Sequence, residues 1–169
     1  LHVDAAFGGY VLPFIENAPA FDFSVPEVGS ISVDPHKMGM STIPSGVLMV
    51  RDEKVFCNLL VETPYLTTKQ AYSLTGTRPG ASVAAAYAVM AYMGRRGMKA
   101  LVSGCMENTR RVIEGMEAFG VQRRVTPDVN VATFEHVSVP SPWIVSYTRR
   151  GDLRIVCMPH VNRDVVEAF

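Results

Sequence analysis

Short apolar runs that end in aspartate or in turn-forming residues occupy the first third of the chain. Leu1 to Asp4 and Ser30 to Asp34 each read as a buried strand that ends in a carboxylate, and Gly46 to Val50 reads as a third strand. Continuous apolar runs of this length are typical of strands covered on both faces in parallel sheets. Between the first two strands, Tyr10 to Ile15 is expected to be a short helix or a loop, because prolines keep the region irregular.

In the middle of the chain, apolar residues recur at helical spacing. Val55 to Leu60 predicts a short helix, and Thr63 to Gly80 reads as a loop rich in glycine and proline. Ala81 to Gly94 and Met98 to Phe119 predict two longer helices. The first of these two is apolar nearly all round, so we expect it to be buried in a core or in an oligomer interface.

The pattern changes again in the last third. Short strands are expected at Val121 to Val125, Asn130 to Glu135, Trp143 to Tyr147 and Leu153 to Met158, and a closing helix from Asn162. The chain is therefore expected to be α/β, with a smaller second lobe.

A domain boundary is expected near Gly94 to Met98, where the pattern changes. It separates residues 1–96 from residues 97–169. The first residue is Leu1, and the last residues read as a helix cut short, so we expect a fragment of a longer protein.

Composition excludes several classes of function. Hydrophobic residues make up 48% of the chain, and sixteen basic residues balance sixteen acidic ones at a pI of about 7.1. This balance favours neither nucleic acid nor an acidic membrane surface as a partner. The three cysteines, Cys57, Cys105 and Cys157, are far apart, so neither a disulfide framework nor a metal site is expected, and a reducing cytoplasm fits. No apolar run reaches transmembrane length.

The candidate chemistry lies at the ends of the first two strands. Asp4 ends one strand, and Lys37 follows the other in the turn Asp34 to Lys37. In open α/β sheets the ligand site lies outside the carboxyl ends of the strands. An amine and a carboxylate placed there suit pyridoxal 5'-phosphate (PLP), whose aldehyde takes a lysine amine and whose ring nitrogen needs a carboxylate partner. Taken singly, such a lysine is a surface residue and such an aspartate a cap.

Two longer strings strengthen this interpretation. Residues 2–9 read HVDAAFGG and residues 32–39 read SVDPHKMG. Together they resemble the group II PLP-dependent amino-acid decarboxylases, and within them the archaeal tyrosine/aspartate decarboxylase branch. The resemblance covers essentially the whole chain, with further similar segments at residues 34–44, 76–83, 105–110 and 154–160.

The resemblance implies roles for four residues. Lys37 matches the lysine that binds the cofactor covalently, and Asp4 matches the aspartate that pairs with the pyridine nitrogen. Ala6 matches the small residue beside the cofactor ring, and His36 matches the histidine near the cofactor phosphate. The implied fold is the PLP-dependent transferase fold of type I, here the C-terminal part of the large domain (residues 1–96) and the small C-terminal α/β lobe (residues 97–169). The implied assembly is a homodimer with a shared active site.

Four further residues are candidates for the site, and each also has an ordinary structural interpretation. Thr77 and Arg78 lie in a glycine-bracketed loop that resembles the corresponding loop of this branch and of sphingosine-phosphate lyases, where glycine and arginine suit an anion. The alternative is an ordinary turn. Arg154 is a candidate for binding the substrate carboxylate, or else a strand-edge ion pair. Tyr65 is a candidate on a mobile catalytic loop, or else a surface residue.

The expected function is decarboxylation of an L-amino acid to an amine and CO2 by a longer parent enzyme. Tyrosine and aspartate are the substrates that the resemblance implies, and glutamate stays open. The family's N-terminal half, which holds the PLP phosphate, is missing, so the isolated chain is expected to be inactive. The alternatives are another PLP lyase of type I, which would release an aldehyde, and a non-catalytic fragment with a structural or dimerisation role.

Overall fold

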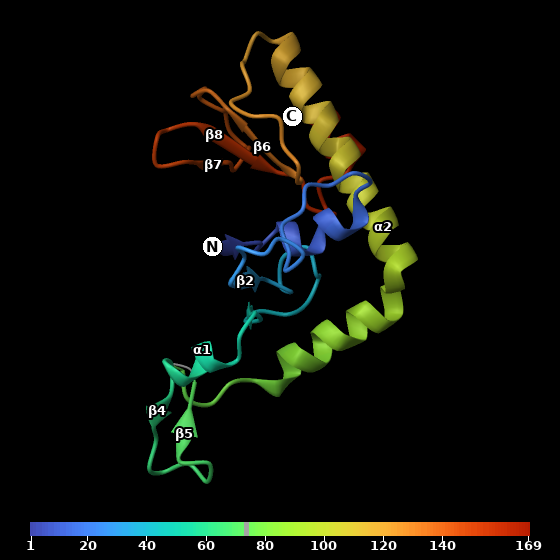
Figure 1. Ribbon diagram of the computed structural model, residues 1–169. Helices are drawn as coiled ribbons and strands as arrows, with labels where there is room; N and C mark the ends of the chain where they lie inside the picture. Colours follow the sequence, from blue (N-terminus) through green and yellow to red (C-terminus); the bar gives the residue numbers. More distant parts are fainter. Residues whose placement is uncertain (73–74) are drawn as a thin grey trace. The chain divides into compact units, whose positions relative to one another are not determined.

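The computed structural model describes residues 1–72 and 75–169 (Figure 1). Its first sheet has three strands. These are β1 (His2–Asp4), β2 (Ser30–Val33) and β3 (Val47–Val50), in the order β1-β2-β3. β1 and β2 are parallel, whereas β2 and β3 are antiparallel. All three strands expected from the apolar runs are confirmed, each within a residue or two of the predicted bounds.

β1 and β2 share one polar face. His2 pairs with Ser30 and Asp4 with Ser32, so the side chains of these four residues share a face. Ile31, on the other face of β2, is 2% exposed. Other buried side chains of the first unit are Ala5, Val28, Val33 and Met38.

Short elements connect the regular ones. Two 3-10 helices, η1 (Gly8–Tyr10) and η2 (Leu12–Phe14), stand where a short helix or loop was expected. α1 (Lys54–Cys57) confirms the short helix, although it ends three residues earlier than expected.

A small hairpin follows α1. β4 (Val61–Glu62) and β5 (Gln70–Ala71) pair antiparallel. The prediction of a loop from Thr63 to Gly80 is therefore wrong at Gln70–Ala71. A strand of two residues is too short to show the period-2 alternation on which a prediction rests. Residues 73–74 of that predicted loop lie outside the described residues.

Two helical segments meet at Gly94 within α2 (Gly80–Ala118). Gly94 has a φ of 56°, a conformation that glycine adopts without the steric penalty of a Cβ. Two helices were predicted, and two are present. The expected gap up to Met98 is absent, because the helix resumes directly after Gly94.

The second sheet, also of three strands, contains β6 (Val131–Phe134), β8 (Leu153–Val156) and β7 (Ser146–Tyr147), in that order and antiparallel throughout. The strand expected at Val121 to Val125 is reduced to one bridge between Arg123 and Phe134. α3 (Arg163–Ala168) closes the chain, and its N-cap Asn162 accepts a hydrogen bond from Val165. The core between this sheet and α2 contains Val112, Ile113, Ala132, Phe134, Leu153 and Cys157.

The contacts divide the chain into two compact units. The first contains Leu1–Gly9 and Ala20–Tyr92, and the second contains Tyr10–Pro19 and Met93–Phe169. In the part of the chain that the structure describes, no helix is both long enough and apolar enough to cross a bilayer.

Candidate cofactor and catalytic site

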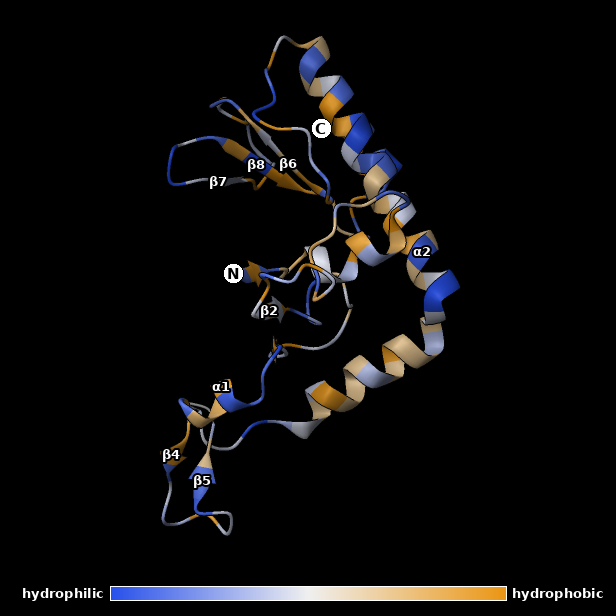
Figure 2. Cartoon of the chain, viewed as in Figure 1, coloured by the Kyte–Doolittle hydropathy of each residue, from blue (hydrophilic) through white to orange (hydrophobic). Residues whose placement is uncertain are grey.

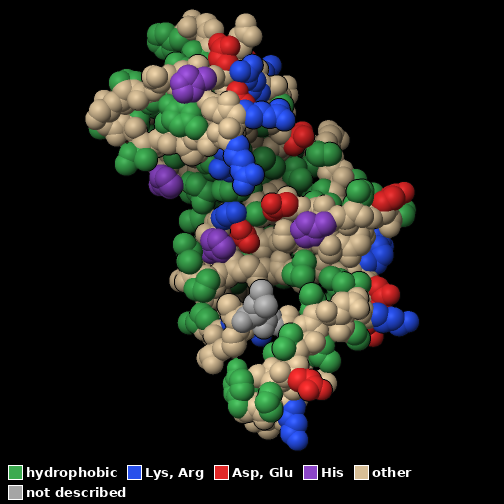
Figure 3. All heavy atoms as spheres, turned by 90° about the vertical axis from the view of Figure 1, so that its left-hand side faces the viewer, with side chains coloured by type: hydrophobic (Ala, Val, Ile, Leu, Met, Phe, Trp, Pro, Cys, Tyr) green, Lys and Arg blue, Asp and Glu red, His purple; other side chains and the backbone are tan. Residues whose placement is uncertain are grey.

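Parallel pairing brings the two sequence motifs to one edge of the first sheet. β1 ends at Asp4, opposite Ser32 of β2, and β2 runs directly into the turn that carries Lys37. The predicted neighbourhood of the two strands is therefore confirmed. Figure 3 turns the view of Figure 1 by 90° about the vertical axis. At the level of β1 and β2 it shows acidic, basic and histidine side chains close together.

The turn after β2 is held by backbone hydrogen bonds and by one buried side chain. The amide of Lys37 donates to the carbonyl of Asp34 over 3.0 Å, and the amide of Ser41 donates to the carbonyl of Pro35 over 2.9 Å. Met38 is fully buried. Burial of Met38 anchors the turn, so its neighbour Lys37 stays at the surface with a defined direction.

The amine of Lys37 has two partners within the first unit. Its Nζ lies 2.8 Å from Oδ2 of Asp34 and 4.9 Å from the centroid of the Phe7 ring. The Lys37 side chain keeps 32% of its surface exposed. It is thus both oriented and reachable by a ligand.

His36 is fixed by the backbone of Ser45. Its Nδ1 lies in hydrogen-bond contact with the carbonyl oxygen of Ser45 and 3.3 Å from the Ser45 amide nitrogen. Its Nε2 lies 3.9 Å from Oδ2 of Asp34. His36 therefore belongs to the same polar cluster as Lys37.

One carboxylate oxygen of Asp4 is held by the protein. Oδ1 accepts a hydrogen bond from the amide of Ala6 over 3.1 Å, and the Ser32 hydroxyl lies 3.4 Å from the same oxygen. Ser32 also lies 3.4 Å from Nε2 of His2. Among the described residues, no hydrogen bond or ion pair reaches Oδ2, which leaves that oxygen for a ligand donor.

Gly9 explains why the first motif ends in glycine. A Cβ at this position would lie 2.7 and 2.8 Å from the two methyl carbons of Val33. Only glycine therefore lets the chain after β1 pack this closely on β2.

Three other predicted site residues lie apart from this cluster. Tyr65, between β4 and β5, is 79% exposed, and Thr77 and Arg78 are exposed just before α2 begins. The hydroxyl of Tyr65 comes within 3.6 Å of where a Cβ on Gly76 would stand. In the described parts of the chain, no hydrogen bond or ion pair joins these three residues to Lys37 or Asp4.

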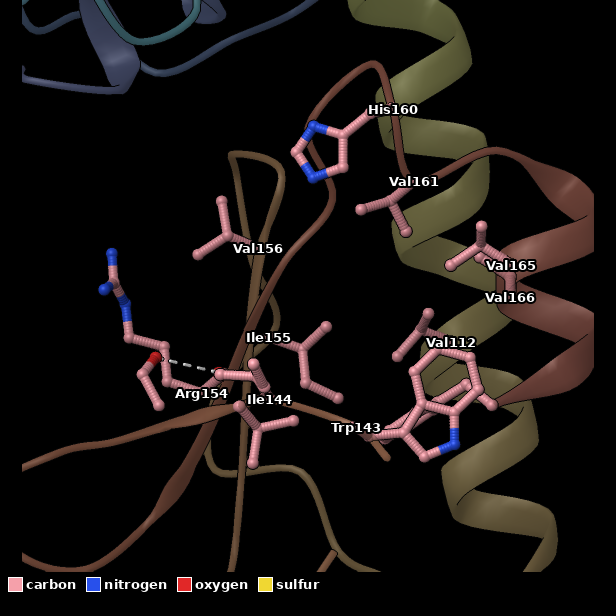
Figure 4. Close-up of a pocket in the computed structure, with 13 residues that line it drawn as sticks. Val112, Trp143, Ile144, Arg154, Ile155, Val156, His160, Val161, Val165 and Val166 are labelled. Atoms are coloured by element: carbon pink, nitrogen blue, oxygen red, sulfur yellow. Dashed lines mark hydrogen bonds between the residues drawn. The ribbon is translucent and has the colours of Figure 1, made fainter. Parts of the chain in front are cut away.

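Arg154 lies on β8 in the second unit, beside an apolar cavity of about 360 Å³. The Ser146 hydroxyl donates to the Arg154 carbonyl over 3.1 Å. Figure 4 shows the guanidinium of Arg154 pointing away from Trp143 and Val112, and His160 on the loop after β8. The apolar cavity wall is formed by side chains of α2, β8, α3 and the segment around β7, among them Val112, Trp143, Ile144, Ile155, Val166 and Phe169.

Sequence reasoning missed two residues that contact the lysine. Asp34 was read as the end of a strand and Phe7 as part of a turn, yet both hold the amine of Lys37. A signal for Asp34 was present, because a residue three positions before a lysine in a tight turn can reach its amine. Phe7 carries no such signal, since its contact depends on the pairing of β1 with β2.

The chain matches a known family over most of its length. Residues 1–132 match the pyridoxal-dependent decarboxylase conserved domain. The whole chain is 90% identical to 46% of a probable L-tyrosine/L-aspartate decarboxylase of Methanospirillum hungatei, and 63% identical to 47% of a protein of the same name from Methanosphaerula palustris. The chain thus spans about half the length of the curated relatives it matches.

Solved structures agree with this assignment. A sphingosine-1-phosphate lyase of Burkholderia pseudomallei superposes with a TM-score of 0.84 at 26% identity, over 99% of this chain and 42% of the lyase. A glutamate decarboxylase of Lactobacillus brevis superposes with a TM-score of 0.79 at 19% identity, over 99% of this chain and 44% of that protein, and this likeness concerns the fold alone. Both confirm the PLP-dependent transferase fold of type I. With its motifs, its fold and its match over residues 1–132, the chain belongs to the pyridoxal-dependent decarboxylase family.

Proposed function

We propose that the parent protein decarboxylates an L-amino acid, tyrosine or aspartate, to the amine and CO2, and that this chain supplies the catalytic lysine. Glutamate stays open as a substrate. The observation that carries the proposal is the meeting of Lys37 and Asp4 at one edge of the first sheet, in a chain 90% identical to a relative named for this activity. We assign residues 1–96 to the C-terminal part of the PLP-binding large domain and residues 97–169 to the small C-terminal domain.

The residues present fit the cofactor that the family uses. The amine of Lys37 is exposed enough to bind an aldehyde. Oδ1 of Asp4 is held by Ala6, which orients Oδ2 for the protonated ring nitrogen. The short side chain of Ala6 leaves room for a ring beside Asp4.

The phosphate of the cofactor needs partners as well. We propose His36 on the turn after β2 for this role, with Thr77 and Arg78 as further contacts. The exposure of Thr77 and Arg78 supports availability to a ligand or to another part of the enzyme. A guanidinium and a hydroxyl are suitable donors to a phosphate.

Each residue of the site then has a defined task. When bound, PLP supplies an electron sink for the pair that remains on the substrate Cα after CO2 leaves. The negative charge of Asp4 keeps the proton on the ring nitrogen, which preserves that sink. The amine of Lys37 anchors the aldehyde, and Phe7 and Asp34 orient this amine.

Substrate contacts are proposed for two residues outside the cluster. Arg154 carries a guanidinium, which suits a bidentate bond to a carboxylate. Tyr65 is largely exposed, so its hydroxyl is available to a bound amino acid.

A homodimer with a shared active site is proposed for the parent. The first half of α2 is apolar, as Figure 2 shows, yet Val83 and Tyr87 are each 72% exposed. Apolar patches of this kind are covered by another surface in a stable protein. Of the two environments expected for this helix, a core or an oligomer interface, burial within this chain is not observed. A covering surface from a second subunit or from the rest of the parent protein is proposed. An archaeal source is proposed from the relatives. A cytoplasmic location is proposed from the three free, widely separated cysteines.

A second candidate reaction is cleavage by a PLP-dependent lyase. It is favoured by the likeness to the sphingosine-1-phosphate lyase at 26% identity. The two reactions differ in product, since a lyase of that kind releases an aldehyde and a decarboxylase releases CO2 and an amine.

The test uses the full-length parent protein with PLP and its Lys37→Ala variant. Tyrosine, aspartate, glutamate and, as the lyase substrate, sphingosine 1-phosphate are supplied separately, and CO2, amine and aldehyde are measured. We expect CO2 and one amine from the unaltered protein, and a loss of at least about a thousandfold in the variant, because the covalent anchor is gone. An aldehyde would favour the lyase, and no product from any substrate would favour a non-catalytic role.

A further inference from the structure

We propose that Asp34 acts as a latch for Lys37: the Asp34 carboxylate holds the lysine amine until the cofactor aldehyde arrives. This inference rests on the proposed function, because it assigns a second residue to the cofactor-binding step of the same site. It also names a group that the sequence motifs did not single out.

The turn after β2 forces the two side chains together. The hydrogen bond from the Lys37 amide to the Asp34 carbonyl closes a tight turn, with Pro35 and His36 between its ends. Such a turn brings the first and fourth residues within about 7 Å at their Cα atoms. Nζ of Lys37 then reaches Oδ2 of Asp34 over 2.8 Å. The contact is thus built into the local chain and needs no distant element.

Several features hold Asp34 in place. Nε2 of His36 lies 3.9 Å from the same Oδ2, and His36 is itself held against the backbone of Ser45. A Cβ on Gly46 would lie 3.4 Å from Oδ1, so the chain passes close to the other oxygen of the carboxylate. The Asp34 side chain is 24% exposed. A carboxylate held this way loses little conformational freedom when it pairs with Lys37.

The pair has a consequence for the reaction with an aldehyde. An amine bonds to an aldehyde carbon through its nitrogen lone pair, and the nitrogen must approach that carbon. While Nζ is held 2.8 Å from Oδ2 it cannot approach that carbon, so the Asp34–Lys37 pair has to open first. Asp34 therefore slows the reaction of Lys37 with stray aldehydes. The Phe7 ring, 4.9 Å from Nζ, keeps the amine in the site in the meantime.

The test measures Lys37 itself, without any substrate turnover. The full-length parent protein is freed of cofactor and treated at neutral pH with a trace of formaldehyde and cyanoborohydride. Methylation of Lys37 is read by peptide mass relative to that of Lys69. The variants are Asp34→Asn, Asp34→Glu, which keeps the charge, and Asp52→Asn as the matched control. Asp52 also lies on a turn after a strand, where its side chain accepts a hydrogen bond from the Lys54 amide.

We expect methylation of Lys37 to rise about two- to fivefold in Asp34→Asn, the range that loss of one partly exposed ion pair gives. Asp34→Glu should restore most of the protection, and Asp52→Asn should match the unaltered protein. Unchanged or slower methylation in Asp34→Asn, with the fold intact by circular dichroism, would overturn the latch. If methylation is unchanged in Asp34→Asn while Lys37→Ala still loses decarboxylase activity, the proposed function stands and only this inference is removed.

Discussion

At the scale of single residues, the site is a pair of opposite charges with different environments. Lys37 is held by a carboxylate and an aromatic ring, whereas Asp4 has one oxygen held and one without a partner among the described residues. These different environments suit the tasks proposed for Lys37 as the anchor and Asp4 as the partner of the ring nitrogen. An anchor must be oriented before a ligand arrives, and a partner for a ring nitrogen must keep a free oxygen.

The Asp4→Asn change tests the role of the carboxylate. Asparagine keeps the shape and loses the charge, so the ring nitrogen loses the partner that keeps it protonated. In the full-length protein we expect kcat to fall by at least about a hundredfold, as when an electrostatic stabiliser is removed, with a smaller loss of PLP affinity. Decarboxylation rates and PLP titration measure the two effects. Equal turnover in both forms would remove Asp4 from the mechanism.

Close packing at Gly9 supports the same site, and a pair of glycine variants measures it. Gly9→Ala puts a methyl group against Val33, whereas Gly80→Ala adds one where no atom lies within 4 Å. We expect Gly9→Ala to lower the free energy of unfolding by about 1–3 kcal/mol. Gly80→Ala should leave it within about 0.5 kcal/mol. Urea unfolding compares them, and equal stabilities would contradict the close contact of the two strands.

At the scale of elements, the apolar pattern predicted the long helices and the strands that are continuous apolar runs. The three strands of the first sheet and both halves of α2 follow from runs and spacing, since burial on a fixed face imposes the pattern. β5 did not follow, because its two residues depend on the partner strand β4. The strand expected at Val121 to Val125 formed only a bridge at Arg123, since most of its residues are exposed and bury no face.

Cys105, in the second half of α2, gives this element a pH-dependent signature. Burial, with a smaller contribution from Cys157, raises the pKa of the Cys105 thiol to about 11 from 9.0. Between these two values the unfolded chain loses the proton and the folded chain keeps it. The free energy of unfolding should therefore fall as pH rises through this window, by about 1.4 kcal/mol per pH unit, and level off above it.

Variants isolate the contribution of Cys105 from that of other groups. Urea unfolding at pH 8, 9.5 and 10.5 compares the unaltered chain with Cys105→Ala and with Cys57→Ala, whose thiol is exposed. The stability advantage over Cys105→Ala should shrink across this range, while Cys57→Ala should follow the unaltered chain. A constant difference at all three pH values would show that Cys105 does not titrate as its burial requires.

At the scale of the whole molecule, the sequence predicted that the two motifs lie at the ends of neighbouring strands and left the outer contacts open. Asp4 ends β1 and Lys37 follows β2 at the same edge, because the two strands are adjacent and parallel. Tyr65, Thr77 and Arg78 are on exposed segments outside the first sheet, with few contacts that a sequence pattern could encode. Local sequence cannot encode such positions alone. The first half of α2 is apolar yet exposed, so its apolar pattern alone did not predict its surroundings.

The most direct test of the account is to trap the cofactor on the full-length parent protein. The protein is incubated with PLP and reduced with borohydride, and its intact mass and peptide map are measured. We expect one pyridoxyl adduct, confined to Lys37. An adduct on another lysine, or none, would contradict the assignment of Lys37 and with it the proposed site.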